Sequence, residues 1–486
     1  MQRKITSLWG EKKVILRQTP RAVTPFGGLS VFIDFMKQIG FPEQVRRDIS
    51  VRLNSPNAID PGETFTAFLI SVVAGARRFA HTGLLRADRA LHALLGMKRF
   101  PSDGTIRNLF KRFTQGMVVR MYEPLWAWQL ERLPRRAGGY SLDLDSTVLE
   151  RYGEQEGVKR GYNPRKPGRG SHHPLLAVLG EGYFILHGWL RSGNTAAGRG
   201  AVEFLKEALA KLESREWIRV VRADSGFFDQ GLLSYLEQQR LSYIVVARLT
   251  RWLKREAARV EQWRALDPLY SVGEFRLQLM GWDQARRFGV VREQLREAKR
   301  SPGRKLFEVP GYTFRVFVTN RPNAVEEIWR DYNQRACVEQ RIEELKSDLA
   351  ADDFCLKEFF ATEAAFLGIL MLFNLLGEFQ RASGMTGYRQ PASLRVQVFL
   401  CGAILGRSGH RTVLHLSEAW GGLEKRNPLF DQLLLYEIPT SRKLEIQPHE
   451  PGSLTPSSLH AEAKNFVQLA NPGSIMVRIR LSREWF

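Results

Sequence analysis

Four polar side chains between residues 332 and 346 have types and spacing that suit work on a phosphate group. Tyr332, Arg335, Glu339 and Lys346 stand at offsets of 0, 3, 7 and 14 residues. At about 100° of helical turn per residue, these offsets predict one polar stripe roughly 60° wide on a helix. A carboxylate beside two cations and a phenol suits a metal ion held next to a phosphate backbone. Taken alone, the segment is also compatible with a solvated helix face stabilised by i, i+4 charge pairs.

Two further carboxylates lie upstream, each at the end of a predicted strand. The run Tyr140–Leu149 alternates, with Leu142 and Leu144 on one face and Asp143 and Asp145 on the other, which predicts a strand. Asp224 follows the apolar run Ile218–Ala223 directly. We therefore expect each of these acidic residues at the edge of a sheet.

The elements around these strands predict an α/β fold. After the first strand we expect two strands of a hairpin, and then helix, strand, helix and strand: Pro174–Leu179, Tyr183–Leu190, Ala201–Leu212, Ile218–Ala223, Leu232–Arg240 and Ser242–Ala247. Three strands followed by this alternation is the element order of an RNase H-like (retroviral-integrase-like) catalytic domain. Alternating runs within 250–325 predict a β-rich insertion, and a long helix is expected over 326–349.

This fold would bring the three carboxylates together. The first and fourth strands of an RNase H-like sheet are neighbours, so Asp145 and Asp224 would meet at one edge, and Glu339 would join them from the helix packed across the sheet. Clustered carboxylates raise one another's pKa unless a cation lies among them. Mg²⁺, with Mn²⁺ as a substitute, prefers such oxygen ligands. Two such ions can activate the attacking oxygen and stabilise the leaving oxygen of a phosphodiester.

These motifs carry a family resemblance. Asp145-Ser-Thr, Asp224 within Arg-Ala-Asp-Ser-Gly, and the Tyr-x2-Arg-x3-Glu-x6-Lys helix resemble bacterial insertion-sequence DDE transposases of the YREK-signature class, with the insertion-sequence thirteen-eighty group as the closest suggestion. The resemblance covers roughly 140–350. It implies that Asp145, Asp224 and Glu339 are the catalytic, metal-binding triad. It also implies contacts to double-stranded transposon-end DNA from three residues: Tyr332, Arg335 and Lys346.

Two assignments within this resemblance have alternatives. Asp143 shares a strand face with Asp145 and is the other candidate for the first ligand; Asp145 is preferred because the family's aspartate precedes two small hydroxyl residues. In related enzymes an aromatic side chain from the insertion receives a flipped base near the cut, which makes Trp263 and Trp282 candidates. Packing within the insertion is the alternative for both tryptophans.

Two basic segments are predicted to contact DNA. The glycine-rich stretch 159–170 carries five cations and no acid: Lys159, Arg160, Arg165, Lys166 and Arg169. We expect it to contact the DNA backbone, with a mobile solvated loop as the alternative. The helical runs Leu84–Leu95 and Ile106–Phe113, the second capped by Ser102 and carrying Arg107 and Lys111, resemble a helix-turn-helix. An ordinary helical pair with a basic outer face is the alternative.

The composition supports a globular protein with a polyanionic partner. The chain has 486 residues and a formal charge of +21 at pH 7, and its three cysteines form no CxxC pair. Phe65–Ala76 and Ala364–Leu376 fall short of the roughly 20 residues that span a bilayer, so both predict buried helices and no membrane partner is expected. Without a signal-peptide pattern at the N-terminus, we expect a cytoplasmic, bacterial nucleoid-associated protein.

The sequence as a whole predicts a DNA transposase. It would bind terminal inverted repeats, cleave the element ends and join the 3′-OH ends to target DNA by metal-dependent transesterification, acting as a homodimer in a synaptic complex. An RNase H-like nuclease without strand transfer and a domesticated, non-catalytic DNA-binding protein are the alternatives. The expected segments are a helical DNA-binding domain over 1–135, the first part of the core over 136–249, the insertion over 250–325, the catalytic helix over 326–354 and a helical C-terminal domain with a tail over 355–486.

Overall fold

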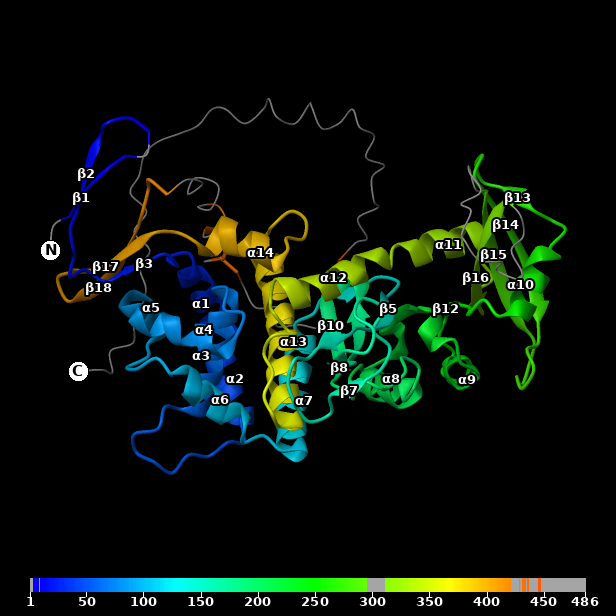
Figure 1. Cartoon of the computed structure of the whole chain (residues 1–486), viewed down its shortest axis with the longest axis horizontal. Helices are drawn as coiled ribbons and strands as arrows, with labels where there is room; N and C mark the ends of the chain where they lie inside the picture. The colour runs from blue at the N-terminus through cyan, green and yellow to red at the C-terminus, as the bar shows by residue number, and fades with distance from the viewer. Residues whose placement is uncertain are drawn as a thin grey trace.

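The structure is a computed structural model that describes residues 3–7, 9–294 and 311–420, together with 428, 431–433, 435–436 and 445–446. In Figure 1 the molecule is elongated, with helices gathered at the N-terminal end and a large sheet extending toward the other end. The part of the predicted C-terminal domain and tail that follows residue 446 lies outside the described residues.

Five strands form one end of the large sheet, in the order β10-β9-β5-β11-β12. They are β5 (Tyr140–Ser146), β9 (Leu175–Leu179), β10 (Phe184–Trp189), β11 (Ile218–Ala223) and β12 (Tyr243–Val246). β5 pairs antiparallel with β9 and parallel with β11, and β9 and β10 form the predicted hairpin. The predicted neighbourhood of the first and fourth strands is therefore confirmed. Helices α8 (Ala201–Ala210) and α9 (Gln230–Gln238) connect the strands as expected.

The strands predicted between 250 and 325 continue this same sheet. After α10 (Arg251–Ala258) come β13 (Arg264–Ala265), β14 (Tyr270–Leu277), β15 (Arg286–Gln294) and β16 (Tyr312–Thr319). β16 pairs antiparallel with β12, which extends the order to β12-β16-β15-β14-β13. Hydrogen bonding to β16 covers the edge that β12 would otherwise expose to solvent. The result is one sheet of nine strands.

The helix predicted over 326–349 is divided in two. α11 (Val325–Asn333) and α12 (Ala336–Ser347) are separated by a turn at residues 334–335. The backbone N–H of Arg335 donates to the Tyr332 carbonyl at 2.9 Å, and that of Val338 donates to the Arg335 carbonyl at 2.8 Å. These i, i+3 bonds tighten the backbone between the two helices. The prediction of an uninterrupted helix was therefore wrong at this point.

Helices from both ends of the chain share one hydrophobic core. The N-terminal helices are α1 (Leu29–Gln38), α2 (Phe41–Asp48), α3 (Pro61–Val73), α4 (Phe79–Thr82), α5 (Arg89–Leu95), α6 (Asp103–Phe110) and α7 (Gln115–Glu131). From the C-terminal part, α13 (Phe359–Ala382) packs against α7, α3 and α6 and against β10 of the sheet. α14 (Pro391–Leu394) follows it. This shared core fixes the sheet relative to the N-terminal helices.

The central helix α13 is longer than predicted. It has 24 residues, and by length and composition alone it could cross a membrane. Yet 83% of its most apolar 18-residue stretch is buried within the protein. Its polar side chains also have internal partners, because Asn374 Nδ2 donates to the Ile185 carbonyl and Glu378 pairs with Arg132. The packing is that of a buried core helix.

The predicted helical pair near residue 100 is present with changed bounds. The Ser102 side chain caps α6 by accepting from the Thr105 backbone N–H at 3.0 Å, so the predicted cap is confirmed. The first run is not one helix, because a 3₁₀ turn over Gly83–Ala87 precedes α5. Gly96 ends α5 with φ 66°, a conformation that favours glycine.

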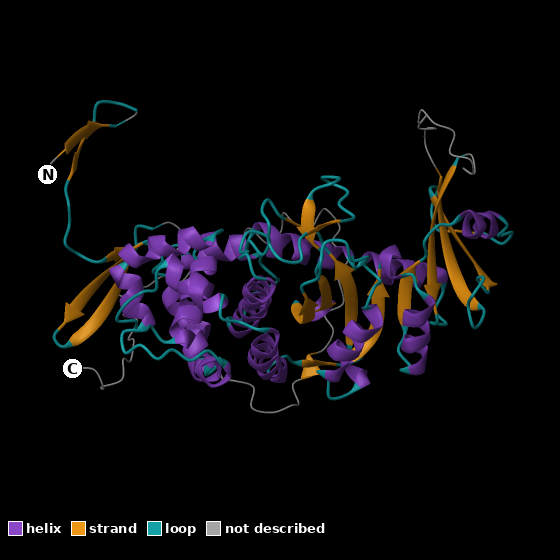
Figure 2. Cartoon of the chain, turned by 60° about the horizontal axis from the view of Figure 1, so that its bottom comes forward, coloured by secondary structure: helices purple, strands orange, loops and turns teal. Residues whose placement is uncertain are grey.

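Short strands lie in regions that were expected to be irregular or helical. Residues 1–25 contain a hairpin of β1 (Arg3–Thr6) and β2 (Lys13–Leu16), which stands away from the body in Figures 1 and 2. β3 (Val23–Thr24) pairs with β17 (Ala403–Ser408), and β17 pairs with β18 (Arg411–Leu416). Two more small sheets are present among the described residues. One pairs β4 (Arg135–Arg136) with β19 (Glu445–Ile446). The other contains β6 (Leu149–Glu150), β8 (Gly170–His172) and β7 (Lys159–Arg160), in that order.

Candidate active site

Asp145 and Asp224 lie side by side at the carboxyl ends of β5 and β11: Asp145 is the last residue but one of β5, and Asp224 directly follows β11. In the parallel pairing of these strands, Ala223 is the partner of Leu144. The residues that follow, Asp224 and Asp145, therefore lie at the same edge. The negative charge of Asp224 contributes to a raised pKa of Asp145, which agrees with this proximity.

Asp145 is buried. Its residue is 8% exposed, and burial raises the pKa of its carboxyl to about 6. The Arg335 guanidinium opposes this rise, whereas the charges of Asp224 and Glu339 add to it. The Ser146 backbone N–H donates to Asp145 Oδ1 at 2.7 Å. The carboxyl group is thus fixed in direction and responsive to nearby charge.

Arg335 lies between two of the three predicted ligands. Its Nη2 is 3.2 Å from Asp145 Oδ2, and its Nη1 is 3.4 Å from Glu339 Oε1. Nη2 also donates to the Leu144 carbonyl at 3.2 Å, and the residue is 3% exposed. Burial alone lowers the pKa of Arg335, but Asp145 and the other negative charges nearby raise it overall. Arg335 therefore supplies the positive charge between these carboxylates.

The helix that carries Glu339 is held from its other side. The Glu339 side chain is 68% exposed. On α12, Arg341 Nη1 lies 2.8 Å from Glu344 Oε1, and the Tyr388 hydroxyl donates to Glu344 Oε2 at 2.6 Å. The Arg341 guanidinium stacks on the Tyr388 ring at 3.9 Å. These contacts hold the buried face of α12, while Glu339 lies on its exposed side and pairs with Arg335.

The donor set suits a hard divalent cation, although the three carboxylates are not gathered around a common point. In the part of the chain that the structure describes, no group of three or more His, Cys, Asp and Glu side chains is close enough to hold a metal ion. The three predicted ligands are all carboxylates, whose oxygens Mg²⁺ and Mn²⁺ prefer. The pairing of Arg335 with Asp145 and Glu339 occupies the space between them.

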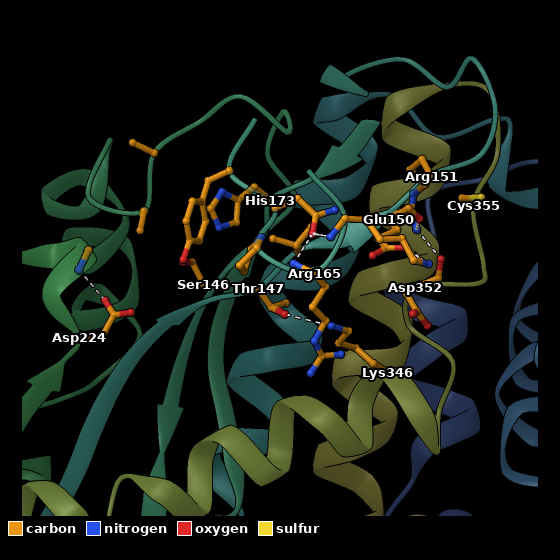
Figure 3. A pocket seen from close by; sticks show the side chains of 18 of the residues that line it. Ser146, Thr147, Glu150, Arg151, Arg165, His173, Asp224, Lys346, Asp352 and Cys355 are labelled. Carbon is orange, nitrogen blue, oxygen red and sulfur yellow. Dashed lines mark hydrogen bonds and ion pairs between the residues drawn. The ribbon is translucent and has the colours of Figure 1, made fainter. Parts of the chain in front are cut away.

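A groove of about 1240 Å³ opens beside these residues. In Figure 3 Asp224 lies at one end of it, Asp352 and Cys355 lie at the other, and Lys346 and Arg165 lie between them. Asp224 Oδ1 accepts from the Gly226 backbone N–H at 2.9 Å. Lys346 Nζ donates to Thr147 Oγ1 at 3.4 Å, which brings α12 to the residues that follow Asp145.

The predicted basic loop forms part of this groove. Arg165 and Lys166 line it. Lys166 Nζ donates to Glu150 at 2.8 Å, and the Arg169 guanidinium lies 4.5 Å from the centre of the Tyr152 ring. The cations Lys159, Arg160 and Arg169 are exposed on the same loop but are not among the residues that line the groove.

Comparison with known proteins identifies the family. Residues 6–433 match the family model described as transposase DDE domain group 1. The chain belongs to this family of DDE transposases. Among solved structures it is similar to the piggyBac transposase synaptic complex with hairpin DNA, determined by cryo-EM, with 13% identity, a TM-score of 0.41, and coverage of 78% of this chain and 83% of that chain. Comparison with curated proteins gives no match.

The match confirms the predicted DDE transposase, while the finer YREK and insertion-sequence thirteen-eighty assignment stays a prediction. In this transposase Asp143 is fully buried, and Arg222 binds both of its carboxylate oxygens at 2.7 Å. Both carboxylate oxygens of Asp143 are thus engaged by Arg222 and closed to solvent. This supports Asp145 rather than Asp143 as the first metal ligand. The triad itself remains a prediction.

Several predicted DNA contacts have internal partners here. Arg335 is buried, so the phosphate contact predicted for it would need a rearrangement. Tyr332 packs on Phe317 with ring centroids 5.0 Å apart, and burial raises the pKa of its hydroxyl. Trp282 packs on Phe228 at 5.3 Å, and the Arg292 guanidinium covers Trp263 at 4.1 Å. Both tryptophans therefore pack against other side chains, which was the alternative to a role in binding a flipped base.

The transposase also has groove residues that the sequence reasoning missed. Arg248 and Asp352 line the main groove, and Asp353 lies where it meets a second groove of about 640 Å³. This second groove is lined by the predicted helix-turn-helix residues Arg107 and Lys111. Arg248 follows β12, and residues just beyond the carboxyl ends of strands in α/β sheets commonly line a ligand site. Its position just after a predicted strand could therefore have identified Arg248 from the sequence.

Proposed function

We propose that this transposase binds the terminal inverted repeats of its element, cleaves there and joins the 3′-OH ends to target DNA. The proposal rests on the position of Asp145 and Asp224, which lie side by side at the carboxyl ends of two adjacent parallel strands. Arg335 links Asp145 to Glu339 on the neighbouring helix. Two carboxylates at one sheet edge and a third on the neighbouring helix, beside a groove lined by cations, suit phosphodiester chemistry on DNA.

We propose an RNase H-like core for this chemistry. Its support is the strand order β10-β9-β5-β11-β12, with β5 antiparallel to β9 and parallel to β11. The strands β13 to β16 would be an insertion that lengthens the sheet between the second aspartate and the glutamate. Such a core delivers the carboxylates from three separate elements, so small movements of α12 can open or close the site.

Asp145, Asp224 and Glu339 would hold Mg²⁺, or Mn²⁺ in its place. When bound, the metal would supply Lewis-acid stabilisation of the oxygens that gain charge at the phosphorus. The chain's own residues would do the rest. Asp145 is directed by the Ser146 N–H and Asp224 by the Gly226 N–H. Arg335 would leave the space between Asp145 and Glu339 and become available to a DNA phosphate.

DNA would follow the two grooves from α6 to the site. The second groove, with Arg107 and Lys111, and the main groove, with Arg165, Lys166 and Lys346, share the lining residues Gln155, Asp353 and Cys355. Shared lining makes one path along which a duplex backbone meets cations in succession. A helix-turn-helix role of α6 would then hold end DNA close to the cut.

The transposase would act as a homodimer in a synaptic complex, because two element ends are joined in one event. A nuclease without strand transfer has the same carboxylates, since hydrolysis and joining differ only in whether water or a 3′-OH attacks. The distinction therefore needs an assay that follows both products.

The test is cleavage and strand transfer on the element's own end DNA, with Mg²⁺ or with EDTA. Wild type is compared with Glu339→Gln, which keeps the side-chain shape and removes its charge. We expect the variant to bind DNA as wild type does while both reactions fall at least about 100-fold. Wild-type cleavage by the variant would refute the triad. Cleavage by wild type without any joining would favour the nuclease.

A further inference from the structure

Beneath the proposed site, charged side chains from three elements meet in one buried network. Asp143 on β5 and Arg222 on β11 are direct partners in the parallel pairing of these strands. Each stands two residues before a proposed ligand, Asp145 or Asp224. Because side chains two apart on a strand point to the same face, Asp143 lies on the face of β5 that carries Asp145.

Arg222 joins both strands to the helix pair. Its Nε and Nη2 donate to the two carboxylate oxygens of Asp143, each at 2.7 Å. Its Nη1 donates to the backbone carbonyl of Asp331 on α11 at 2.6 Å and lies 3.2 Å from Asp331 Oδ1. The side chains of Asp143 and Arg222 are 0% and 3% exposed, and that of Asp331 is 11% exposed. One guanidinium thus binds β5 and α11 from its place on β11.

Asp331 is further held by two other arginines. Arg219 on β11 donates to both of its carboxylate oxygens, at 2.6 and 2.9 Å. Arg321, in the segment between β16 and α11, donates to Asp331 Oδ2 as well. The last turn of α11, just before α12 begins, is therefore fixed to β11 by several directional bonds.

Such a network sets position more than it adds stability. Replacing a buried ion pair by apolar residues of similar volume is often neutral or stabilising, because charges are costly to remove from water. A bidentate pair, however, is satisfied only when the two strands are in one register. A slip of β11 along β5 would separate Arg222 from Asp143 and Asp224 from Asp145 together.

We propose that Asp143, Arg222 and Asp331 are positioning residues that set the relative placement of the three catalytic carboxylates. The network fixes Asp145 against Asp224 through the register of β5 and β11. It fixes Glu339 through the attachment of α11 to β11. This inference rests on the proposed function, because it concerns the geometry of that same site.

The test replaces the central pair by apolar side chains in the full-length protein. The variant Asp143→Leu with Arg222→Met removes the directional bonds without leaving a lone buried charge. A second variant, Asp331→Asn, keeps hydrogen-bond acceptance and weakens the attachment of α11. For each, kcat and KM of end cleavage are measured, together with the affinity for Mn²⁺ by isothermal titration calorimetry.

A matched control comes from the same protein. Arg132, directly after α7, and Glu378 on α13 form another buried bidentate pair, with bonds of 2.6 and 2.9 Å, among the core helices rather than at the sheet edge. The variant Arg132→Met with Glu378→Leu makes the same chemical change there. Thermal unfolding of all variants shows whether each remains folded.

We expect both network variants to remain folded, to keep the wild-type KM, and to lose roughly 10- to 100-fold in kcat and in Mn²⁺ affinity. The control pair should keep both values. A folded network variant with wild-type kcat and Mn²⁺ affinity would overturn the proposal, as would an equal loss in the control. Wild type and Glu339→Gln are run alongside, so a wild type that neither cuts nor binds Mn²⁺ refutes the proposed function instead.

Discussion

Arg335 determines the electrostatic state of the site at the scale of single residues. It is 3% exposed and pairs with Asp145 and Glu339, so it balances charge that a metal ion would otherwise balance. The sequence predicted that Arg335 and Glu339 share one helix face and assigned Arg335 to DNA, but it did not show that Arg335 is buried against Asp145. Spacing along a helix gives the direction of a side chain and not its depth below the surface. The burial of Arg335 depends on its contacts with Leu144 and Asp145 of β5, which lies far away in the sequence.

Asp145 leads to a prediction about pH. Its carboxyl has a pKa of about 6, raised mainly by burial, so below that pH it is mostly protonated. A metal ligand must be deprotonated, so protons compete with the ion. We expect the affinity for Mn²⁺ to be nearly constant above about pH 7 and to fall roughly tenfold per unit of pH below about pH 6. Titration calorimetry over this range measures it.

The control for this titration is Asp145→Asn, which has no carboxyl to protonate at that position. The variant should bind Mn²⁺ more weakly and with a shallower pH dependence. The same steep loss near pH 6 in the variant would show that another group is responsible.

At the scale of elements, local patterns predicted the strands and missed what tertiary contacts decide. Alternation identified β5 and β15, and the apolar run identified β11, but no local signal shows that β16 pairs with β12. The turn at 334–335 interrupts residues with good helix propensity, and it coincides with the bond from Arg335 to the Leu144 carbonyl. Glu378 obscured the length of α13, because its internal partner, Arg132, lies far away in the sequence.

The cap of α6 gives a prediction at this scale. Ser102 Oγ accepts from the Thr105 N–H at 3.0 Å, so Ser102→Ala leaves that donor without its partner. We expect the free energy of unfolding to fall by about 1 kcal/mol. Urea denaturation measures it. Ser102→Asn, which can still cap, should recover most of the loss. Equal destabilisation by both substitutions would contradict a capping role.

At the scale of the whole molecule, charge and shape act together. The formal charge of +21 is spread along the chain, and part of it lines the two grooves that meet at Asp353. The sequence showed the charge but not the path, since Arg107 and Arg165 belong to segments that only the fold brings to connected grooves. The common core of α13, α7 and β10 holds these segments in place.

The proposed path predicts how salt affects DNA binding. Each cation that contacts a phosphate releases a counterion, so removing one contact lowers the slope of log affinity against log salt by about 0.9. We expect this change for Arg165→Gln, because Arg165 is exposed and lines the main groove. Lys37→Gln is the control, since Lys37 pairs with Glu43 in the helical part of the molecule and lines neither groove. Fluorescence anisotropy over a salt series measures both slopes, and equal slopes for the two variants would contradict the path.

The most direct test of the account is the position of Mn²⁺ in crystals of the full-length transposase bound to its end DNA, located by anomalous diffraction. We predict an ion about 2.1 Å from carboxylate oxygens of both Asp145 and Asp224, with Glu339 nearby and Arg335 displaced from Asp145. An ion bound elsewhere, with the pair between Arg335 and Asp145 intact beside the DNA, would contradict the three-carboxylate site.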